Sequence, residues 1–388
     1  MSTSDGSEGA ARLAAAGVTV GADVRAWLGD DVTLGAGVSI GDGAVLVARS
    51  LHLGDGVRIA AGADIRSDRV ELGVRTEIGA AVGVLVSDEF TVGPAGRIED
   101  HTSITCRSFR AGRLFYLGHD SSVGYGGTMT STARFTAGDQ VALGPHSILN
   151  ANHAIELEDQ VGSGAYLSIW THGFHFGHRL LDGYGTAFAP VHIERNVWLG
   201  YHVTVLPGVR IGPDTILAAG AVASRNLPGG VLAAGVPAVV KRPLAPAAIT
   251  GDEAYARVVA LVADWVEELR WKEIPVEIDA DGTVVLHGIR VVVHPPGGPL
   301  PGDESRRTIM LSTEPVDAAA VGAELLVFDL RTGVLHGTLD EIGHDLRDFL
   351  RRSALPCGDA EPFQSLPPSG FERLRNPELS ARYRVGSS

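Results

Sequence analysis

Aliphatic residues recur every six positions across most of the chain between Val18 and Arg242. From Leu28 the sequence runs LGDDVT, LGAGVS and IGDGAV, and after a short break LGDGVR, IAAGAD, LGVRTE and IGAAVG. The period returns later as VGSGAY, IERNVW, LGYHVT, VLPGVR, IGPDTI and LAAGAV. Each hexad has an aliphatic residue first, usually a small residue second, and a small or β-branched residue fifth.

A period of six is a multiple of the strand period of two, so each hexad predicts one short strand followed by a turn. Three such strands can close into a triangular coil, and successive coils stack at roughly 4.8 Å, the ordinary strand separation. The aliphatic side chains then form ladders in a narrow interior with little room for aromatic rings. The composition agrees, because glycine reaches 50 of 388 residues while aromatic residues make up only 6%.

Two stretches interrupt the hexads. Residues 107–135, RSFRAGRLFYLGHDSSVGYGGTMTSTARF, break the rhythm and are rich in Gly, Ser and Thr. Residues 173–191 form a second non-repeating segment, which we expect to leave the coil as a loop. With about 18 residues in each coil, the region allows roughly a dozen coils, and the coils before about Phe90 carry no recognisable site.

The sequence after about Ala248 has a different pattern. The segment DEAYARVVALVADWVEELRWK has apolar residues at spacings of three and four, which predicts an amphipathic helix. Strand-like runs TVVLHGIRVVV, RRTIMLS and AELLVFDL follow, and DEIGHDLRDFLRRSAL predicts a closing helix. We therefore predict a flexible N-terminus over 1–17, a β-helix over 18–242, a small α+β domain over 250–355, and an irregular tail over 356–388. The fold class is mainly β.

Charge and targeting signals exclude several functions. A formal charge of −14 and a pI near 5.4 disfavour nucleic acid and anionic membranes, which need a basic face. The opening MSTSDGSEGA has neither a basic nor an apolar region of a secretion signal, and no apolar run approaches the roughly 18–20 residues of a membrane span. Cys106 and Cys357 lie far apart. These features predict a cytoplasmic protein without disulfides.

Five motifs in the second half carry a specific resemblance. They are THGFH at 171–175, NVWLG at 196–200, VLPGVRIG at 205–212, AAGAVASRNLP at 218–228 and AAGVPAVVKR at 233–242. The chain from Val18 to Arg242 resembles the hexapeptide-repeat acyltransferases. The part from Leu149 to Arg242 is most similar to the thiogalactoside, maltose and nodulation-type O-acetyltransferases. The resemblance implies a left-handed parallel β-helix and a homotrimer with active sites between subunits.

The histidines of IWTHGFHFGH, residues 169–178, raise three alternatives: a metal site, a catalytic base or neither. The resemblance places His172 at the position of the family's general base, a task that suits imidazole because its ordinary pKa is about 6.5. It implies that Asn150, His175 and Trp198 contribute to the acceptor site. His178 is expected to be a solvated loop residue, and we predict no metal.

The cofactor residues also follow from the resemblance. Gly200, Tyr201 and Ala219 match positions where the family's backbone meets the pantetheine arm of coenzyme A. Ser224 and Arg225 match a threonine-lysine pair beside the cofactor, and Arg242, with its neighbour Lys241, matches a basic residue near the phosphates. Lys241 is included because it is a second cation next to Arg242. A basic cluster after the last coil suits an anionic nucleotide in a chain that is acidic overall.

The sequence therefore predicts an acyltransferase that uses acetyl-CoA or another acyl-CoA as donor and acylates a hydroxyl or amine of a small polar acceptor. A sugar or a natural-product intermediate fits that description, and a carrier protein is an alternative partner. Direct attack predicts that Cys106 is dispensable. Two other interpretations stay open, a trimeric β-helix scaffold or ligand-binding protein and a zinc hydratase similar to the γ-class carbonic anhydrases.

Overall fold

The structure is a computed structural model that describes residues 6–124, 130–173, 180–185, 187–301, 306–358 and 364–366. The chain divides into two compact units, Met1–Pro246 and Ala247–Ser388. Within the described residues no helix is both long and apolar enough to cross a membrane.

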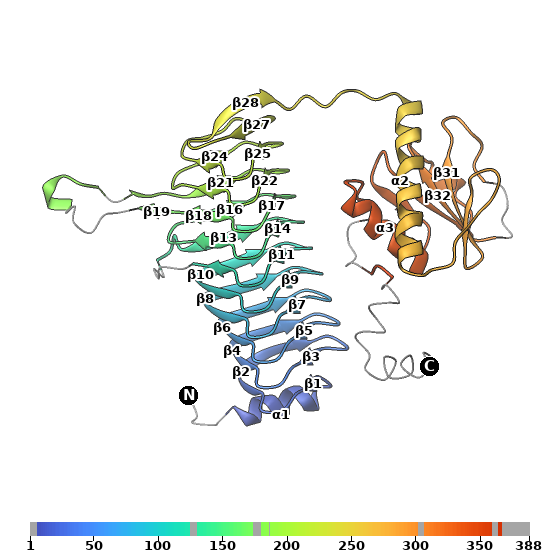
Figure 1. Cartoon of the computed structure of the whole chain (residues 1–388). Coiled ribbons are helices and arrows are strands. Elements are labelled where there is room, and N and C mark those ends of the chain that lie inside the picture. The colour runs from blue at the N-terminus through green and yellow to red at the C-terminus, as the bar shows by residue number, and fades with distance from the viewer. Residues whose placement is uncertain are drawn as a thin grey trace, which may run out of the picture. The chain divides into compact units, whose positions relative to one another are not determined.

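The first unit is a parallel β-helix of stacked coils (Figure 1). One face is a 12-stranded sheet of short strands, parallel except for the last, which pairs antiparallel with its neighbour. Its strands, in order, are β1 (Thr19–Val20), β3 (Ser39–Ile40), β5 (Arg58–Ile59), β7 (Glu77–Ile78), β9 (Arg97–Ile98), β11 (Tyr116–Leu117), β14 (Ala142–Leu143), β17 (Gly162–Ser163), β22 (Trp198–Leu199), β25 (Ile216–Leu217), β27 (Val231–Ala234) and β28 (Val239–Pro243).

The other two faces form a 14-stranded sheet whose first five strands run across both. These five are β2 (Arg25–Leu34), β4 (Val45–Leu53), β6 (Asp64–Leu72), β8 (Gly83–Val92) and β10 (Ser103–Ala111). Above β10 the faces separate. One continues as β12 (Ser122–Val123), β15 (Ile148–Asn150), β18 (Ser168–Trp170), β23 (Thr204–Val205) and β26 (Val222–Ala223), and the other as β13 (Arg134–Ala137), β16 (Ile155–Leu157), β21 (Val191–Ile193) and β24 (Arg210–Ile211).

The predicted aliphatic ladder lies inside the coils. Ile40 pairs with Ile59 and Ile59 with Ile78, and all three are buried. Each of these coils therefore takes 19 residues, whereas the pairing of Leu199 with Leu217 gives a coil of 18. The mainly β class and the stacked parallel coils are confirmed, with a slightly longer repeat in the first half than the hexads predict.

Four phenylalanine rings fill the middle of the β-helix. The ring centroid of Phe109 lies 5.5 Å from that of Phe90, 5.8 Å from that of Phe115 and 4.8 Å from that of Phe135, and all four side chains are fully buried. The expectation that the interior has little room for aromatic rings is wrong here. Stacked and tilted ring pairs pack these side chains against one another in the interior.

The N-terminal segment is a helix where the sequence predicts a flexible end. Helix α1 (Ser7–Ala15) places Leu13, which is fully buried, in the core of the β-helix. Arg12 donates a 2.7 Å hydrogen bond from Nη1 to the carbonyl oxygen of Gly29. A solenoid needs its open end covered, and a nine-residue helix with a single buried leucine gives too short a pattern to reveal that role.

The first predicted interruption is shorter in the structure, whereas the second has its predicted extent, because the coils resume at β21. Residues 107–123 stay within regular coils as β10, β11 and β12, so the first departure begins only near Gly124 and ends at Arg134. The second is anchored by an antiparallel pair, β19 (His172–Gly173) with β20 (Ala187–Phe188). It carries the short 3-10 helix η1 (Leu180–Asp182) outward from the coils (Figure 1).

The second unit joins helices to one six-stranded sheet. The sheet order is β29 (Glu277–Ile278), β30 (Val284–Leu286), β31 (Ile289–His294), β32 (Thr308–Ser312), β33 (Leu325–Asp329) and β34 (Val334–His336). The pairs β31–β32 and β32–β33 are parallel. Helices α2 (Gly251–Trp271) and α3 (Glu341–Arg352) share a core with the sheet, and η2 (Ala318–Ala320) lies between β32 and β33. Every predicted element of this unit is present.

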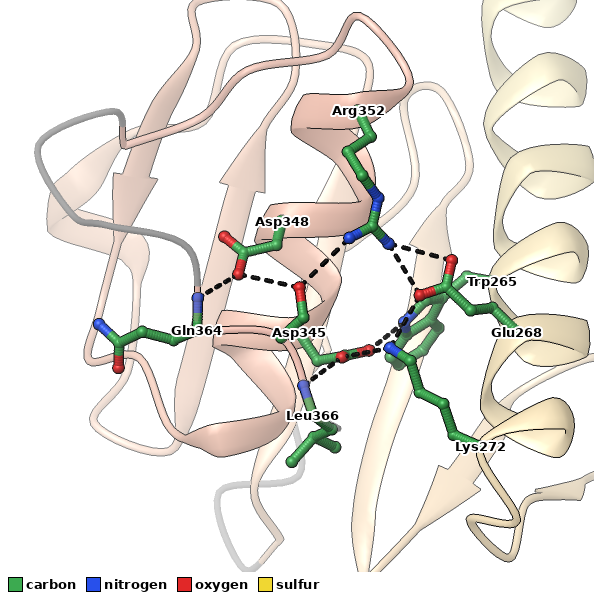
Figure 2. Close-up of polar contacts among 9 residues, drawn as sticks. Trp265, Glu268, Lys272, Asp345, Asp348, Arg352, Gln364 and Leu366 are labelled. Carbon is green, nitrogen blue, oxygen red and sulfur yellow. Dashed lines mark hydrogen bonds and ion pairs between the residues drawn. The ribbon is translucent and has the colours of Figure 1, made fainter. Parts of the chain in front are cut away.

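A buried polar network joins α2 to α3 (Figure 2). Lys272 Nζ lies 2.6 Å from Asp345 Oδ1, and 2.8 Å from Glu268 Oε1. The indole Nε1 of Trp265 donates to Asp345 Oδ2 at 2.9 Å. Asp345 Oδ1 also accepts a 2.7 Å bond from the backbone N–H of Leu366. The carboxylate thus ties two helices to a described part of the tail, most of which lies outside the described residues.

Candidate active site around His172

His172 lies where the polypeptide leaves the coil, directly after β18. Its Nδ1 is 2.6 Å from Asn150 Oδ1, and the Asn150 side chain is almost wholly buried. Asn152 Nδ2 lies 3.2 Å from the same Oδ1 and 2.9 Å from Nδ1. The sequence prediction that Asn150 and His172 belong to one site is consistent with this geometry, because the turn after β15 and the end of β18 are neighbours in adjacent coils.

Two contacts meet at Nδ1 of His172. A carbonyl oxygen only accepts, so the contact to Asn150 Oδ1 is a hydrogen bond when Nδ1 carries the proton, whereas the contact to Asn152 Nδ2 is one when Nδ1 carries the lone pair. In the first tautomer the lone pair is on Nε2, and this is the form in which Nε2 can act as a base. An amide partner orients the ring without adding a negative charge beside it.

Two further residues shape this corner. Thr171 is fully buried, donates from Oγ1 to the carbonyl oxygen of Asn150 at 2.5 Å and accepts from the backbone N–H of His153 at 2.9 Å. The ring of Phe188 stacks on the imidazole of His172 at 5.6 Å between centroids, with 20° between the planes. The imidazole is held by asparagines at Nδ1 and by an aromatic face, which limits its rotation.

Sequence reasoning missed Asn152, Thr171 and Phe188. Asn152 sits in the same LNANH motif as Asn150, two positions later, so the motif itself contained a signal. Phe188 could not be found this way, because it comes from the non-repeating segment. His175 and His178 lie outside the described residues.

The other predicted acceptor residue, Trp198, lies on a different face. It belongs to β22 in the 12-stranded sheet and is 50% exposed. A Cβ at Gly162 on the neighbouring strand would come within 2.9 Å of its ring, so glycine makes room for the indole. Trp198 also lines a cavity of about 260 Å³ with Gln160, Asp214 and Leu244. Within one chain, therefore, the fold brings Asn150 to His172 and places Trp198 on the other sheet.

Part of the predicted cofactor set gathers at one corner of the coils. Gly200 and Tyr201 follow β22, Ala219 follows β25 in the next coil, and the backbone N–H of Gly220 donates to the carbonyl oxygen of Tyr201 at 2.8 Å. A Cβ on Gly200 would lie 2.6 Å from the backbone nitrogen of Ala219. The requirement for glycine here thus has a structural cause, namely the close approach of two coils.

The predicted cationic residues lie in the last coils. Ser224 and Arg225 are exposed directly after β26, and Lys241 and Arg242 are exposed on β28. Arg242 pairs with Leu232, which pairs with Ile216, which in turn pairs with Trp198. Arg242 and Trp198 therefore stand in one row across the 12-stranded sheet.

A column of rings continues from Tyr201 toward the N-terminal coils. Tyr166 lies 5.7 Å from Tyr201, His146 stacks on Tyr166 at 4.8 Å, and His119 lies 5.0 Å from His146. His119 Nδ1 is 2.8 Å from Asp120 Oδ2, and this hydrogen bond lowers the pKa of the Asp120 carboxyl. His119, Asp120 and His146 are the one group of potential metal ligands found together in the described part of the chain, with ligand atoms within 4.8 Å of one another.

Cys106 has the properties of a packing residue. It is 1% exposed inside the β-helix, and burial raises the pKa of its thiol to about 12, although its Sγ donates to the carbonyl oxygen of Ser108. A thiolate is the nucleophilic form of cysteine, so this side chain stays protonated and unreactive near neutral pH. Cys357 is likewise buried, and its Sγ donates to the carbonyl oxygen of Asp329 at 3.7 Å.

Comparison with known proteins identifies the repeat. Residues 190–224 match the family model described as "Bacterial transferase hexapeptide (six repeats)". The galactoside O-acetyltransferase of Lactococcus lactis is 52% identical over 52 residues, which are 13% of this chain and 25% of that protein. The enzyme of the same name from Escherichia coli is 30% identical over 130 residues, 31% of this chain and 63% of that protein. The chain therefore spans less than two thirds of the length of either relative.

Parts of the chain are also similar to solved structures. A hexapeptide-repeat acetyltransferase from Vibrio cholerae complexed with acetyl coenzyme A is 28% identical, with 34% of this chain and 72% of that chain covered at a TM-score of 0.28. A galactoside acetyltransferase in complex with coenzyme A is 22% identical, with 38% and 66% covered, also at 0.28. Of the residues discussed above, Trp198, Gly200, Tyr201, Ala219 and Ser224 lie within the segment that matches the family model.

Proposed function

We propose that this chain, whose β-helix carries the repeats of the bacterial hexapeptide transferases, is a CoA-dependent acetyltransferase that acylates a hydroxyl or amine of a small polar acceptor. The observation that carries the proposal is the 2.6 Å contact between Nδ1 of His172 and Oδ1 of Asn150, which makes Nε2 the basic nitrogen when Nδ1 carries the proton. Support for the donor comes from the shared corner of Gly200, Tyr201 and Ala219.

The proposed reaction is a direct attack. The acceptor oxygen or nitrogen forms a bond to the thioester carbonyl carbon while Nε2 of His172 removes its proton. Backbone N–H groups stabilise the oxyanion of the tetrahedral intermediate. The carbon–sulfur bond then breaks, and the CoA thiolate takes the proton from the imidazolium. The products are the acylated acceptor and free CoA, and no residue of the chain is acylated.

The acceptor site and the assembly belong to the same proposal. Asn150 is almost fully buried and contacts His172 through its Oδ1. We therefore propose that the acceptor contacts Asn150 only where it also contacts His172. We propose that Trp198 contributes from the face of a neighbouring subunit in a homotrimer, because within one chain it lies on a different sheet from His172. His175 is retained as a proposed acceptor residue. Light scattering on the purified protein measures the oligomeric state.

A turnover assay with His172→Ala tests the proposed base. With acetyl-CoA and a panel of sugars and small amines, we expect thiol release to fall by about 10²–10⁴-fold in this variant, with acetyl-CoA affinity by calorimetry unchanged. The control is His192→Ala, which removes another half-buried histidine. His192 lies on β21, and its Nε2 is 2.8 Å from Glu158 Oε1. Full activity in His172→Ala, or a burst of acylated protein without acceptor, contradicts the proposal.

One specific observation keeps the zinc hydratase alternative testable. It is the group of His119, Asp120 and His146, which contains none of the histidines in the 169–178 segment. A hydratase requires stoichiometric zinc in the purified protein and CO₂ hydration that disappears with chelation. The scaffold alternative instead requires acyl-CoA binding without turnover for any acceptor. Acetyl transfer that is insensitive to chelators excludes both as the main activity.

A further inference from the structure

The second unit contains a pocket of about 410 Å³ formed entirely by its own residues. This volume falls within the range of small-molecule sites in proteins. The wall combines residues of α2 and of the segment before it with residues after two strands and after α3. They are Ile249, Ala254, Arg257, Val258, Leu261, Thr313, Leu330, Arg331, Ser353, Ala354 and Leu355.

The position of the pocket follows from the topology of the sheet. Thr313 directly follows β32, and Leu330 and Arg331 directly follow β33, so the pocket lies at the carboxyl ends of two adjacent parallel strands. Ligands of open sheets with parallel strands bind at this edge, where the loops after the strands diverge. The first turns of α2 and the residues after α3 close the remaining sides.

The lining is apolar inside and cationic at the mouth. Val258 is buried, and Leu261, Leu330 and Leu355 are half-buried, whereas Arg257 and Arg331 are exposed. Arginine side chains in this arrangement pack their methylene groups along apolar surface and keep the guanidinium in water. The pocket thus offers an apolar floor for a hydrocarbon chain and two fixed positive charges for an anionic head group.

A buried hydroxyl on the wall lacks a partner. The Oγ1 atom of Thr313 is inaccessible to solvent and has no hydrogen-bond partner among the described residues. An unsatisfied buried hydroxyl costs roughly 1–3 kcal/mol in proteins. Because this oxygen is closed to solvent, a molecule in the pocket does not contact it, and the choice of ligand rests on the apolar lining and the arginines.

Two carboxylates lie beside the arginines and keep their negative charge. Glu253 faces Arg257, but its carboxylate accepts the backbone N–H of Thr250 at 2.7 Å in the cap of α2. Asp329 accepts the backbone N–H groups of Arg331 and Thr332 at 3.0 and 2.9 Å. Both acidic groups are thus held by backbone donors.

We propose that this pocket binds a medium-chain carboxylate, with the chain on the floor and the carboxylate between Arg257 and Arg331. The class follows from the combination of an apolar lining and two cations. A neutral apolar molecule would leave the charges unused, and a small inorganic anion would leave the floor empty. The inference concerns the second unit alone and does not depend on the activity proposed for the β-helix.

Calorimetry with sodium octanoate on the full chain tests this site. We expect saturable 1:1 binding, at least tenfold weaker binding of 1-octanol, and at least a tenfold loss of octanoate affinity in the double variant Arg257→Ala/Arg331→Ala. The control is Arg270→Ala, on the same helix but outside the pocket lining. A second variant, Ala254→Phe, fills the pocket with a ring and should abolish binding while circular dichroism stays unchanged.

Several outcomes overturn the proposal. They are the absence of octanoate binding by the native chain, equal binding by the double arginine variant, and binding that survives Ala254→Phe. Equal affinity for octanoate and octanol also contradicts it, because the arginines would then have no role. Because acetyl transfer is measured separately with His172→Ala, failure of either proposal leaves the other untouched.

Discussion

At the scale of single residues, the candidate base differs from many catalytic histidines in its partner. Nδ1 of His172 bonds a neutral amide, Asn150, and not a carboxylate. The amide positions the imidazole without placing a negative charge beside it. The positions of Asn150 and His172 were predictable from sequence, whereas the second amide at Asn152 depended on how the turn folds.

Substituting Asn150 with aspartate tests that positioning role. In Asn150→Asp a carboxylate would face Nδ1 and stabilise the protonated imidazole. The base would then stay protonated up to a higher pH, so the acidic limb of the kcat/KM profile should move to higher pH. Asn226→Asp is the control, because Asn226 is exposed and only accepts the backbone N–H of Arg210. An unmoved limb in an active, folded variant would contradict the assigned contact.

At the scale of elements, helix periodicity predicted α2 and α3 well but could not show how they are joined. The pattern of α2 identifies an apolar face, and Val262, Trp265 and Leu269 are indeed buried on it. Lys272 and Asp345 would ordinarily be read as solvated charges, yet they are 4% and 0% exposed. A charge is buried only when its partner is in place, and that partner is 73 residues away in sequence.

The network between α2 and α3 predicts a large stability effect. Asp345→Asn keeps an oxygen acceptor for Trp265 Nε1 but leaves Lys272 without its closest counter-charge, which should lower the free energy of unfolding of the second unit by roughly 3 kcal/mol. The matched control is Glu267→Gln on α2, whose ion pair with Arg270 is exposed and should change stability by less than about 1 kcal/mol. Urea unfolding followed by fluorescence measures both. Equal effects of the two substitutions would show that burial of the pair does not matter.

At the scale of the whole molecule, the chain consists of two units, each with its own sheets and its own core. The aliphatic ladder and the four phenylalanine rings belong to the first core, and the residues of α2, α3 and the six-stranded sheet belong to the second. The β-helix also carries its own N-terminal cover in α1. Both units therefore have what a domain needs to fold independently.

This organisation predicts that residues 1–246 fold without the rest of the chain. The shortened protein should show a β-type circular dichroism spectrum and a cooperative thermal transition within a few degrees of that of the β-helix in the full chain. The cut falls in the exposed stretch after β28, where no strand is interrupted. Insoluble protein, or loss of the cooperative transition, would show that the β-helix needs the second unit for its stability.

The sequence by itself determined the repeat, the stacked parallel coils and the α+β character of the second unit. These follow from periodicity, which is a local property of a chain, whereas the candidate pair of Asn150 and His172 was implied by the family resemblance and stays a prediction. Only the tertiary structure decided the phenylalanine core of the β-helix, the helix that covers the first coil, the second amide beside the histidine and the pocket at the carboxyl ends of β32 and β33. Each of those depends on residues that are distant in sequence and come together through packing, so no local pattern records them.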